Sequence, residues 1–161
     1  VLYFEHKKLY RLPRLREELP EDDYIVEIGK ARTRRDGRDL SIFTFGAQVL
    51  TALDAAEELE KEGLDVEVID LRTLAPLDKD AILASVKKTS RALILHEASL
   101  TGGIGGEIAA IISAEAFEWL DAPVVRVASL DTPVPYSPPL EDYYLPQVKD
   151  VLDAARKLAA Y

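Results

Sequence analysis

The hydrophobic and polar positions follow a regular pattern from about residue 39 onward. Residues 40–46 and 66–71 are short runs rich in β-branched and aromatic side chains, and residues 92–96 and 123–128 repeat this pattern. Runs of this length and composition predict β-strands. The run at 92–96 is almost continuously apolar, which is typical of a strand buried on both faces of a sheet.

Amphipathic helices are predicted between and after these runs, because apolar side chains recur there every three to four residues. The last segment shows this spacing most clearly, in Val148, Val151, Leu152, Ala155 and Leu158. We expect helices over residues 47–62, after Asp78 as N-cap, after the glycine-rich turn 101–106 with Trp119 facing inward, and over about 146–160. The proline-rich stretch 131–139 is expected to be a loop.

Strands that alternate with helices predict crossover connections and a mainly parallel sheet. We therefore expect an α/β fold, a three-layer α/β/α domain around a five-stranded sheet. Val1–His6 is a further β-prone run, and the charged segment after it, with its two prolines, reads as an extended connection. The chain divides on this basis into an arm, residues 1–38, and a folded domain, residues 39–161.

Composition and charge exclude several classes of protein. Of the 161 residues, 48% are hydrophobic and 30% charged, a balance typical of a soluble globular domain. No window is long and apolar enough to span a membrane, and without cysteine there can be no disulfide, thiolate nucleophile or zinc–thiolate site. The chain starts at Val1 and contains no methionine, so we expect a fragment, a processed chain or an engineered one.

The charge is unevenly distributed along the chain. Residues 1–38 carry a net charge of +2, and residues 39–161 carry −11. An acidic surface repels phosphate backbones, so we expect no nucleic-acid partner for the domain. A basic protein partner would suit it better.

The turn Gly102–Gly106 lies between a strand and a helix, where nucleotide phosphates often bind. Its spacing does not match G-x-G-x-x-G, because Ile108 stands where the third glycine is needed, and the turn has no P-loop lysine. Glu107 would also repel a phosphate. The turn therefore favours a structural role, in which glycines allow close packing of helix and strand.

His96 and Glu97, at a strand end, are the best local acid/base candidates. Adjacent strand residues point to opposite faces, so the two side chains need not cooperate. A histidine hydrogen-bonded into the following loop is the favoured interpretation. Asp70 and Arg72 are expected to form a structural ion pair, and the turn at Asp131 to position a surface.

Three segments resemble one family: VIDLRTLAPLD (68–78), SVKKTSRALILHEASLTGGIGGEIAA (85–110) and LDAPVVRVASLDTPVPYSPPLEDYYLP (120–146). They are similar to the carboxyl-terminal, transketolase-like domain of the β subunit of thiamine-diphosphate-dependent 2-oxo acid dehydrogenases, the E1 component. YFEHKKLYR (3–11) resembles the last strand of that subunit's pyrimidine-binding domain and the start of its linker. The motif LTGGIGGE and the final tyrosine favour the branched-chain enzymes over the pyruvate enzymes.

The resemblance implies an α₂β₂ heterotetramer that decarboxylates a 2-oxo acid with thiamine diphosphate and Mg²⁺. The acyl group then passes to a lipoyl group on E2. The family's catalytic residues lie in segments that this sequence does not contain, so the resemblance implies no catalytic, cofactor-binding or metal-binding residue here. We expect the isolated chain to bind no cofactor and to be inactive.

The expected partners are the E1 α subunit, a second β chain and the small basic peripheral-subunit-binding domain of E2. The matching positions for partner binding are Asp121, Arg126 and Tyr161. The resemblance also implies a cytoplasmic location in a bacterium, or the mitochondrial matrix in a eukaryote. Two alternatives remain open: a free-standing small-ligand enzyme that uses His96 and Glu97, and a scaffold engineered from the family.

Overall fold

The computed structural model describes residues 2–18 and 20–161. The three short 3₁₀ helices are η1 (Lys7–Arg11), η2 (Pro13–Leu15) and η3 (Phe117–Trp119). The strands are β1 (Arg32–Arg35), β2 (Leu40–Thr44), β3 (Val66–Asp70), β4 (Ala92–Ser99) and β5 (Val125–Ser129). The α-helices are α1 (Gln48–Lys61), α2 (Lys79–Thr89), α3 (Ile104–Glu115), α4 (Pro138–Tyr144) and α5 (Val148–Ala159).

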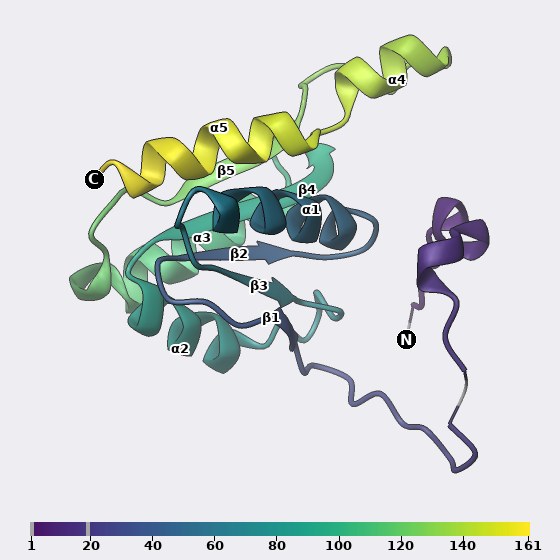
Figure 1. The fold of residues 1–161 in the computed structure, drawn as a ribbon, viewed down its shortest axis with the longest axis horizontal. Coiled ribbons are helices and arrows are strands. Elements are labelled where there is room, and N and C mark those ends of the chain that lie inside the picture. The colour runs from purple at the N-terminus through teal and green to yellow at the C-terminus, as the bar shows by residue number, and fades with distance from the viewer. Residues whose placement is uncertain (1, 19) are drawn as a thin grey trace.

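The five strands form one sheet in the order β1-β3-β2-β4-β5 (Figure 1). All neighbouring strands run parallel except β1, which pairs antiparallel with β3. The expected three-layer fold is thereby confirmed. The carboxyl ends of β2 to β5 meet at one edge, where loops of parallel α/β sheets commonly carry function.

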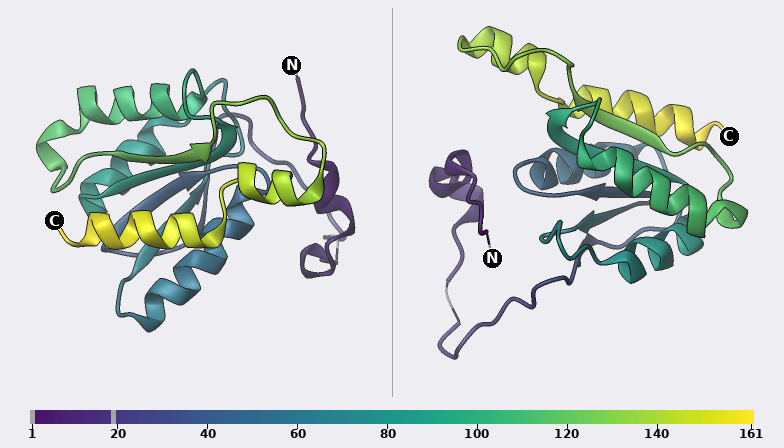
Figure 2. Two further views of the ribbon diagram at one scale, coloured as in Figure 1. Left: turned by 90° about the horizontal axis from the view of Figure 1, so that it is seen from above. Right: turned by 180° about the vertical axis from the view of Figure 1, so that it is seen from behind.

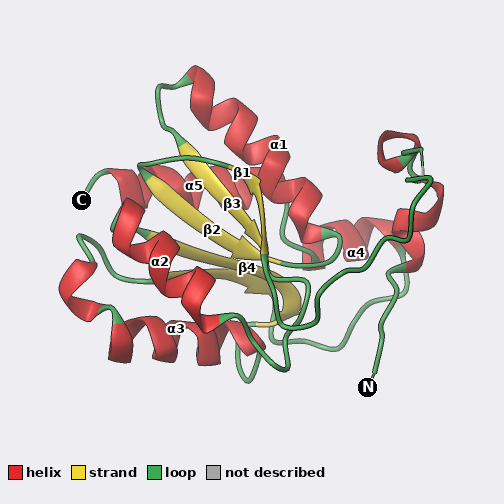
Figure 3. Cartoon of the chain, turned by 90° about the horizontal axis from the view of Figure 1, so that it is seen from below, coloured by secondary structure: helices red, strands yellow, loops and turns green. Residues whose placement is uncertain are grey.

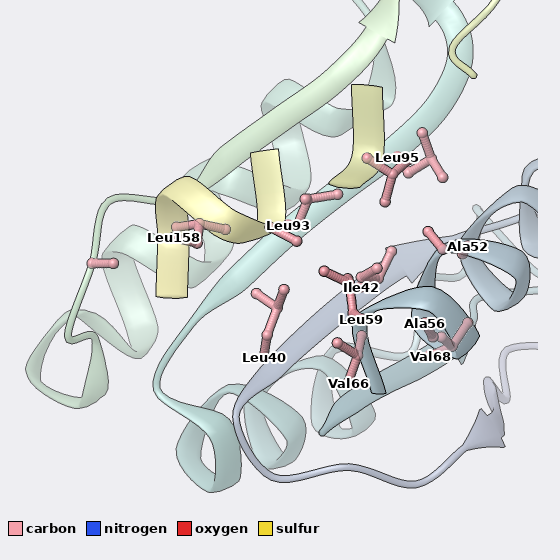
Figure 4. Packing of buried hydrophobic residues seen from close by; sticks show 14 residues of the cluster. Leu40, Ile42, Ala52, Ala56, Leu59, Val66, Val68, Leu93, Leu95 and Leu158 are labelled. Atoms are coloured by element: carbon pink, nitrogen blue, oxygen red, sulfur yellow. The ribbon is translucent and has the colours of Figure 1, made fainter. Parts of the chain in front are cut away.

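Helices cover both faces of the sheet, as Figure 3 shows. One face packs against α1 and α5, in a cluster that includes Ile42, Leu59, Leu93 and Leu158 (Figure 4). The other face packs against α2 and α3. Residues 92–96 of β4 are all buried, which agrees with their almost continuous apolar run.

Helix α2 shows how the local sequence places an element. Asp78 precedes it, and its Oδ1 accepts a hydrogen bond from the Ala81 amide at 3.2 Å, as expected of an N-cap. The other oxygen, Oδ2, accepts from the Ala31 amide at 2.9 Å. One buried carboxylate thus starts the helix and also fixes the chain that leads into β1.

Residues 2–18 and 20–28 extend away from the sheet (Figure 2). Two contacts connect this segment to the domain: His6 Nε2 lies 3.2 Å from Glu97 Oε2, and Arg14 Nη1 lies 2.8 Å from Asp54 Oδ1. Residues 2–6 form no strand, contrary to the β-prone run, and Val1 lies outside the described residues. The fifth strand is β1 instead, which comes from within the expected arm; the boundary at residue 38 stays a prediction.

Candidate functional site

His96 lies at the carboxyl edge of the sheet, where chemistry would be expected. Its ring is fully buried, and Nδ1 lies 3.1 Å from the Ala98 carbonyl oxygen. Nε2 has no hydrogen-bond partner. The histidine is therefore bonded into its own loop, as the favoured interpretation predicts, and exposes no atom to a substrate.

The glycine-rich turn packs directly on this ring. A Cβ on Gly103 would lie 2.6 Å from His96 Cε1, and one on Gly105 would lie 2.7 Å from Cδ2 and closer still to Nε2. Only glycine allows helix α3 to approach β4 so closely. The predicted packing role of the turn is thereby confirmed.

Glu97 points away from His96 and toward the amino-terminal segment. Its Oε2 lies 3.2 Å from Nε2 of His6, and its side chain is about one-third exposed. The two neighbours thus have separate partners, as their alternation along the strand predicts. His96 and Glu97 therefore do not form an acid/base pair at this edge of the sheet.

The buried ring predicts a pH dependence of stability. Burial lowers the pKa of His96 below its ordinary value of about 6.5. Below about pH 6.5 the imidazole of the unfolded chain takes up a proton, whereas the buried ring of the folded chain stays neutral. The stability that the neutral ring contributes is therefore fully present above about pH 6.5 and is lost as the pH falls toward the pKa of the folded state. We expect the free energy of unfolding in urea to be lower at about pH 5.5 than at about pH 7.5.

Two variants separate this effect from the general acid response. His96→Gln should reduce the change in the free energy of unfolding with pH. His6→Gln, which keeps the buried ring, should leave that change as it is in the unchanged chain. The same pH dependence of the free energy of unfolding in the His96→Gln variant and in the unchanged chain would contradict the prediction.

Two loops at the same edge are tied together by polar contacts. The carboxylate of Asp131 accepts a hydrogen bond from the backbone amide of Thr101 at 2.9 Å and another from the Thr101 hydroxyl at 2.6 Å. These bonds lower the pKa of Asp131. Nη1 of Arg126 donates to the Leu100 carbonyl at 2.9 Å. Both charged groups are therefore engaged within the chain, and Arg126 holds the loop that leads into α3.

The expected ion pair between Asp70 and Arg72 is wrong. Asp70 lies 3.9 Å from Arg34 on β1, and Arg72 donates its Nε–H to the Lys30 carbonyl at 3.2 Å. Only the Arg72 backbone amide reaches Asp70, at 3.1 Å. Arg34 belongs to the antiparallel strand β1, which the sequence pattern did not predict, and Lys30 lies just before that strand.

A second candidate region lies at the opposite end of the sheet, where β5 begins. Asp121 is exposed in the loop before β5, and its amide donates to the Ser90 carbonyl at 2.9 Å. Tyr161 follows α5 and ends at this side of the domain, 71% exposed (Figure 1). The structure therefore brings Asp121 and Tyr161 to one end, while Arg126 lies along β5 and points toward the other.

Exposed aromatic side chains add to this end of the domain. Phe117 is 76% exposed and Trp119 44% exposed, so the expected inward position of Trp119 is wrong. Helix α3 ends at Glu115, and the 3₁₀ turn that follows rotates Trp119 to the surface beneath Lys87, whose Nζ lies 5.6 Å from the ring centre. Helical periodicity alone could not have revealed this aromatic and acidic surface.

Residues 2–18 and 20–161 contain no helix that is long and apolar enough to cross a membrane. Within the same ranges, no group of three or more histidine, cysteine, aspartate or glutamate side chains is arranged to hold a metal ion.

Comparison with known families bears directly on these features. The transketolase C-terminal domain family matches residues 29–151, which include the whole sheet, helices α1 to α4 and the first turn of α5. The chain belongs to this family. The match begins just before β1, and it covers both candidate regions of the domain except for residues 152–161.

Several known proteins are similar to this transketolase C-terminal domain. The β subunit of the pyruvate dehydrogenase E1 component of Bacillus subtilis is 50% identical over 161 residues, which are 100% of this chain and 49% of that protein. The corresponding Staphylococcus aureus subunit is 47% identical over 157 residues, 98% of this chain and 47% of that protein. A solved structure described as a split gene transketolase in an inactive β4 tetramer aligns with a TM-score of 0.74 at 29% identity, covering 89% of this chain and 46% of that one.

The chain spans about half the length of the curated relatives that it matches. Both are pyruvate dehydrogenase subunits, so the comparisons give no support to the branched-chain preference drawn from the final tyrosine and LTGGIGGE. The chain is therefore a transketolase C-terminal domain that is similar to about half of an E1 β subunit.

Proposed function

We propose that this domain serves assembly and docking in the E1 β subunit of a 2-oxo acid dehydrogenase complex. The observation that carries the proposal is the 50% identity to an E1 β subunit over the whole chain. The relatives favour pyruvate as the 2-oxo acid. In the complete enzyme, thiamine diphosphate with Mg²⁺ would perform the decarboxylation, and the acyl group would pass to lipoyl-E2.

The residues of this chain do not fit the cofactor. The glycine turn at the start of α3, which could have received a diphosphate, packs on the His96 ring instead. Glu107 lies exposed in the first turn of that helix, where it would repel phosphate. We therefore assign the cofactor and the reaction to other parts of the enzyme.

The proposed partners are the E1 α subunit, a second β chain and the basic binding domain of E2. For the E2 domain we propose the surface where β5 begins, which combines Asp121 and Tyr161 with exposed Phe117 and Trp119. Aromatic side chains commonly supply most of the binding energy at interfaces, and acidic groups attract a basic partner. In a bacterium, such an enzyme would work in the cytoplasm.

Isothermal titration with the basic E2 domain tests this function. We expect the chain to bind that domain and to bind no thiamine diphosphate with Mg²⁺. Asp121→Lys should weaken binding about tenfold, because it places a positive charge against a basic partner. Glu57→Lys, an equal charge change on the exposed face of α1, is the matched control and should bind normally. Cofactor binding without E2 binding would overturn the proposal.

A further inference from the structure

Basic side chains gather where β3 ends and β1 begins, although the protein as a whole carries a net charge of −9. β1 runs antiparallel to β3 with Arg32 opposite Asp70, so the start of β1 lies at the carboxyl edge of the sheet (Figure 3). Arg35, farther along β1, pairs with Glu60 at 3.1 Å and lies outside this group. The basic patch consists of four exposed residues, Lys30, Arg32, Arg34 and Arg72.

The arginines of the basic patch converge on one carboxylate, that of Asp70. Nη1 of Arg34 lies 3.9 Å from its Oδ2, and the Arg72 backbone amide donates to its Oδ1 at 3.1 Å. Burial raises the pKa of Asp70, and the positive charges of all three arginines oppose that shift. Three guanidinium groups therefore lie close enough to act on a single negative charge, which leaves an excess of positive charge around it.

The backbone holds the arginine at the end of β3 in place. Arg72 has a φ of 54°, in the left-handed region, and its Nε donates to the Lys30 carbonyl at 3.2 Å. The chain before Lys30 is fixed in turn, because the Gly29 amide donates to Oγ1 of Thr73 at 3.1 Å. Among the residues that the structure describes, the terminal amino groups of Arg72 and the guanidinium group of Arg32 have no acceptor, so both can bind an external anion.

We propose that the basic patch binds a small anion that carries a phosphate group. Guanidinium groups donate paired hydrogen bonds to phosphate oxygens, and their convergence on one point fits a compact dianion better than an extended acidic segment. The magnesium complex of thiamine diphosphate is not expected there, because Mg²⁺ neutralises most of the diphosphate charge. The site lies at the opposite end of the sheet from the surface proposed for E2, and it does not depend on the proposed function.

Titration of the ¹⁵N-labelled full chain with inorganic phosphate tests the site by NMR. Sodium chloride keeps the ionic strength constant at about 0.15 M, so that general screening does not change during the titration. We expect the amide resonances of residues 30–34 and 70–73 to shift together, with a Kd on the order of 1 mM. O-phosphoserine distinguishes the sources of the phosphate group: tighter binding than inorganic phosphate assigns the site to a phosphate ester, and equal or weaker binding assigns it to free phosphate.

Variants that change binding in opposite directions give a sharper test. Arg32→Gln and Arg72→Gln should each weaken phosphate binding about fivefold, because each removes a guanidinium donor. Asp70→Asn should strengthen it about fivefold, since the side-chain oxygen can still accept from the Arg72 amide while the negative charge is lost. Arg38→Gln removes the same charge from an exposed arginine in the loop before β2, at the other end of the sheet, and is the matched control that should change nothing.

Circular dichroism shows whether each variant keeps its fold, and Arg32→Gln keeps the test decisive because that side chain is exposed. Resonances of the patch that stay unchanged at about 10 mM phosphate would overturn the site. So would equal weakening by Arg32→Gln and Arg38→Gln, or weaker binding by Asp70→Asn, because either result would show that phosphate responds only to the overall charge. None of these results bears on binding to the E2 domain, which is measured separately.

Discussion

Replacing Gly105 by alanine is expected to destabilise the domain by about 3 kcal/mol, at the upper end of what overpacking a core costs. The added methyl group would collide with the buried His96 ring, 2.7 Å from Cδ2. Neither group can move freely, because the ring is enclosed and Gly105 belongs to α3, which packs on the sheet. The loss should appear as a lower urea concentration at the unfolding midpoint, while the dependence of the free energy of unfolding on urea concentration stays unchanged.

Gly106 provides the matched control, one residue farther along the same helix. A Cβ there would meet only Nη1 of Arg126, at 3.4 Å. Gly106→Ala should therefore be neutral or stabilising by up to about 1 kcal/mol, since alanine favours a helix. Combining Gly105→Ala with His96→Ala should relieve the collision and recover part of the loss. Equal effects of the two glycine changes would refute the packing argument.

Replacing Lys88 by methionine is expected to cost about 2–3 kcal/mol, because it leaves the carboxylate of Glu67 buried without its cation. Glu67 is 3% exposed, and Nζ of Lys88 pairs with its Oε1. The remaining donors to Glu67 are the hydroxyls of Ser41 and Ser85. We place the cost below that of a fully buried pair because the Lys88 side chain is 39% exposed.

Thermal unfolding of a small set of variants checks this pair. Lys87→Met changes the same residue type one position earlier, where Nζ lies over Trp119, and should cost less than about 1 kcal/mol. Adding Glu67→Gln to Lys88→Met removes the unpaired charge and should restore part of the stability. A Lys88→Met variant as stable as Lys87→Met would show that the buried carboxylate is not held by its lysine.

Hydrophobic spacing was enough to predict the parallel part of the fold. Four strands and four helices lie where the pattern predicts them, because each strand buries a short apolar run and each helix buries one apolar face. They are β2, β3, β4 and β5 and α1, α2, α3 and α5. Strand β1 was missed because its sequence, RTRR, contains no apolar residue. It exists through pairing with β3 and through the contact of Ala31 with Asp78, neither of which local sequence reveals.

Helix α4 was not predicted, and the proline-rich loop expected over residues 131–139 takes in its first two residues. Proline is favoured in the first turn of a helix, where its missing amide hydrogen is not needed, so Pro138 and Pro139 mark the start of the helix. The packing function of the glycine turn was predictable because its spacing fails the nucleotide-binding pattern. The exposed position of Trp119 was not predictable, since it depends on where helix α3 ends.

The margin of the sheet at β1 is protected against the addition of further strands. Beyond β3, the outermost strand carries Arg32, Arg34 and Arg35, and its pairing with β3 is interrupted by a bulge between Thr33 and Arg35. Positive charge and an irregular backbone discourage further hydrogen-bonded neighbours. The β1 margin is therefore a poor template for added strands, and concentrated preparations of this acidic protein should not lengthen into fibrils from it.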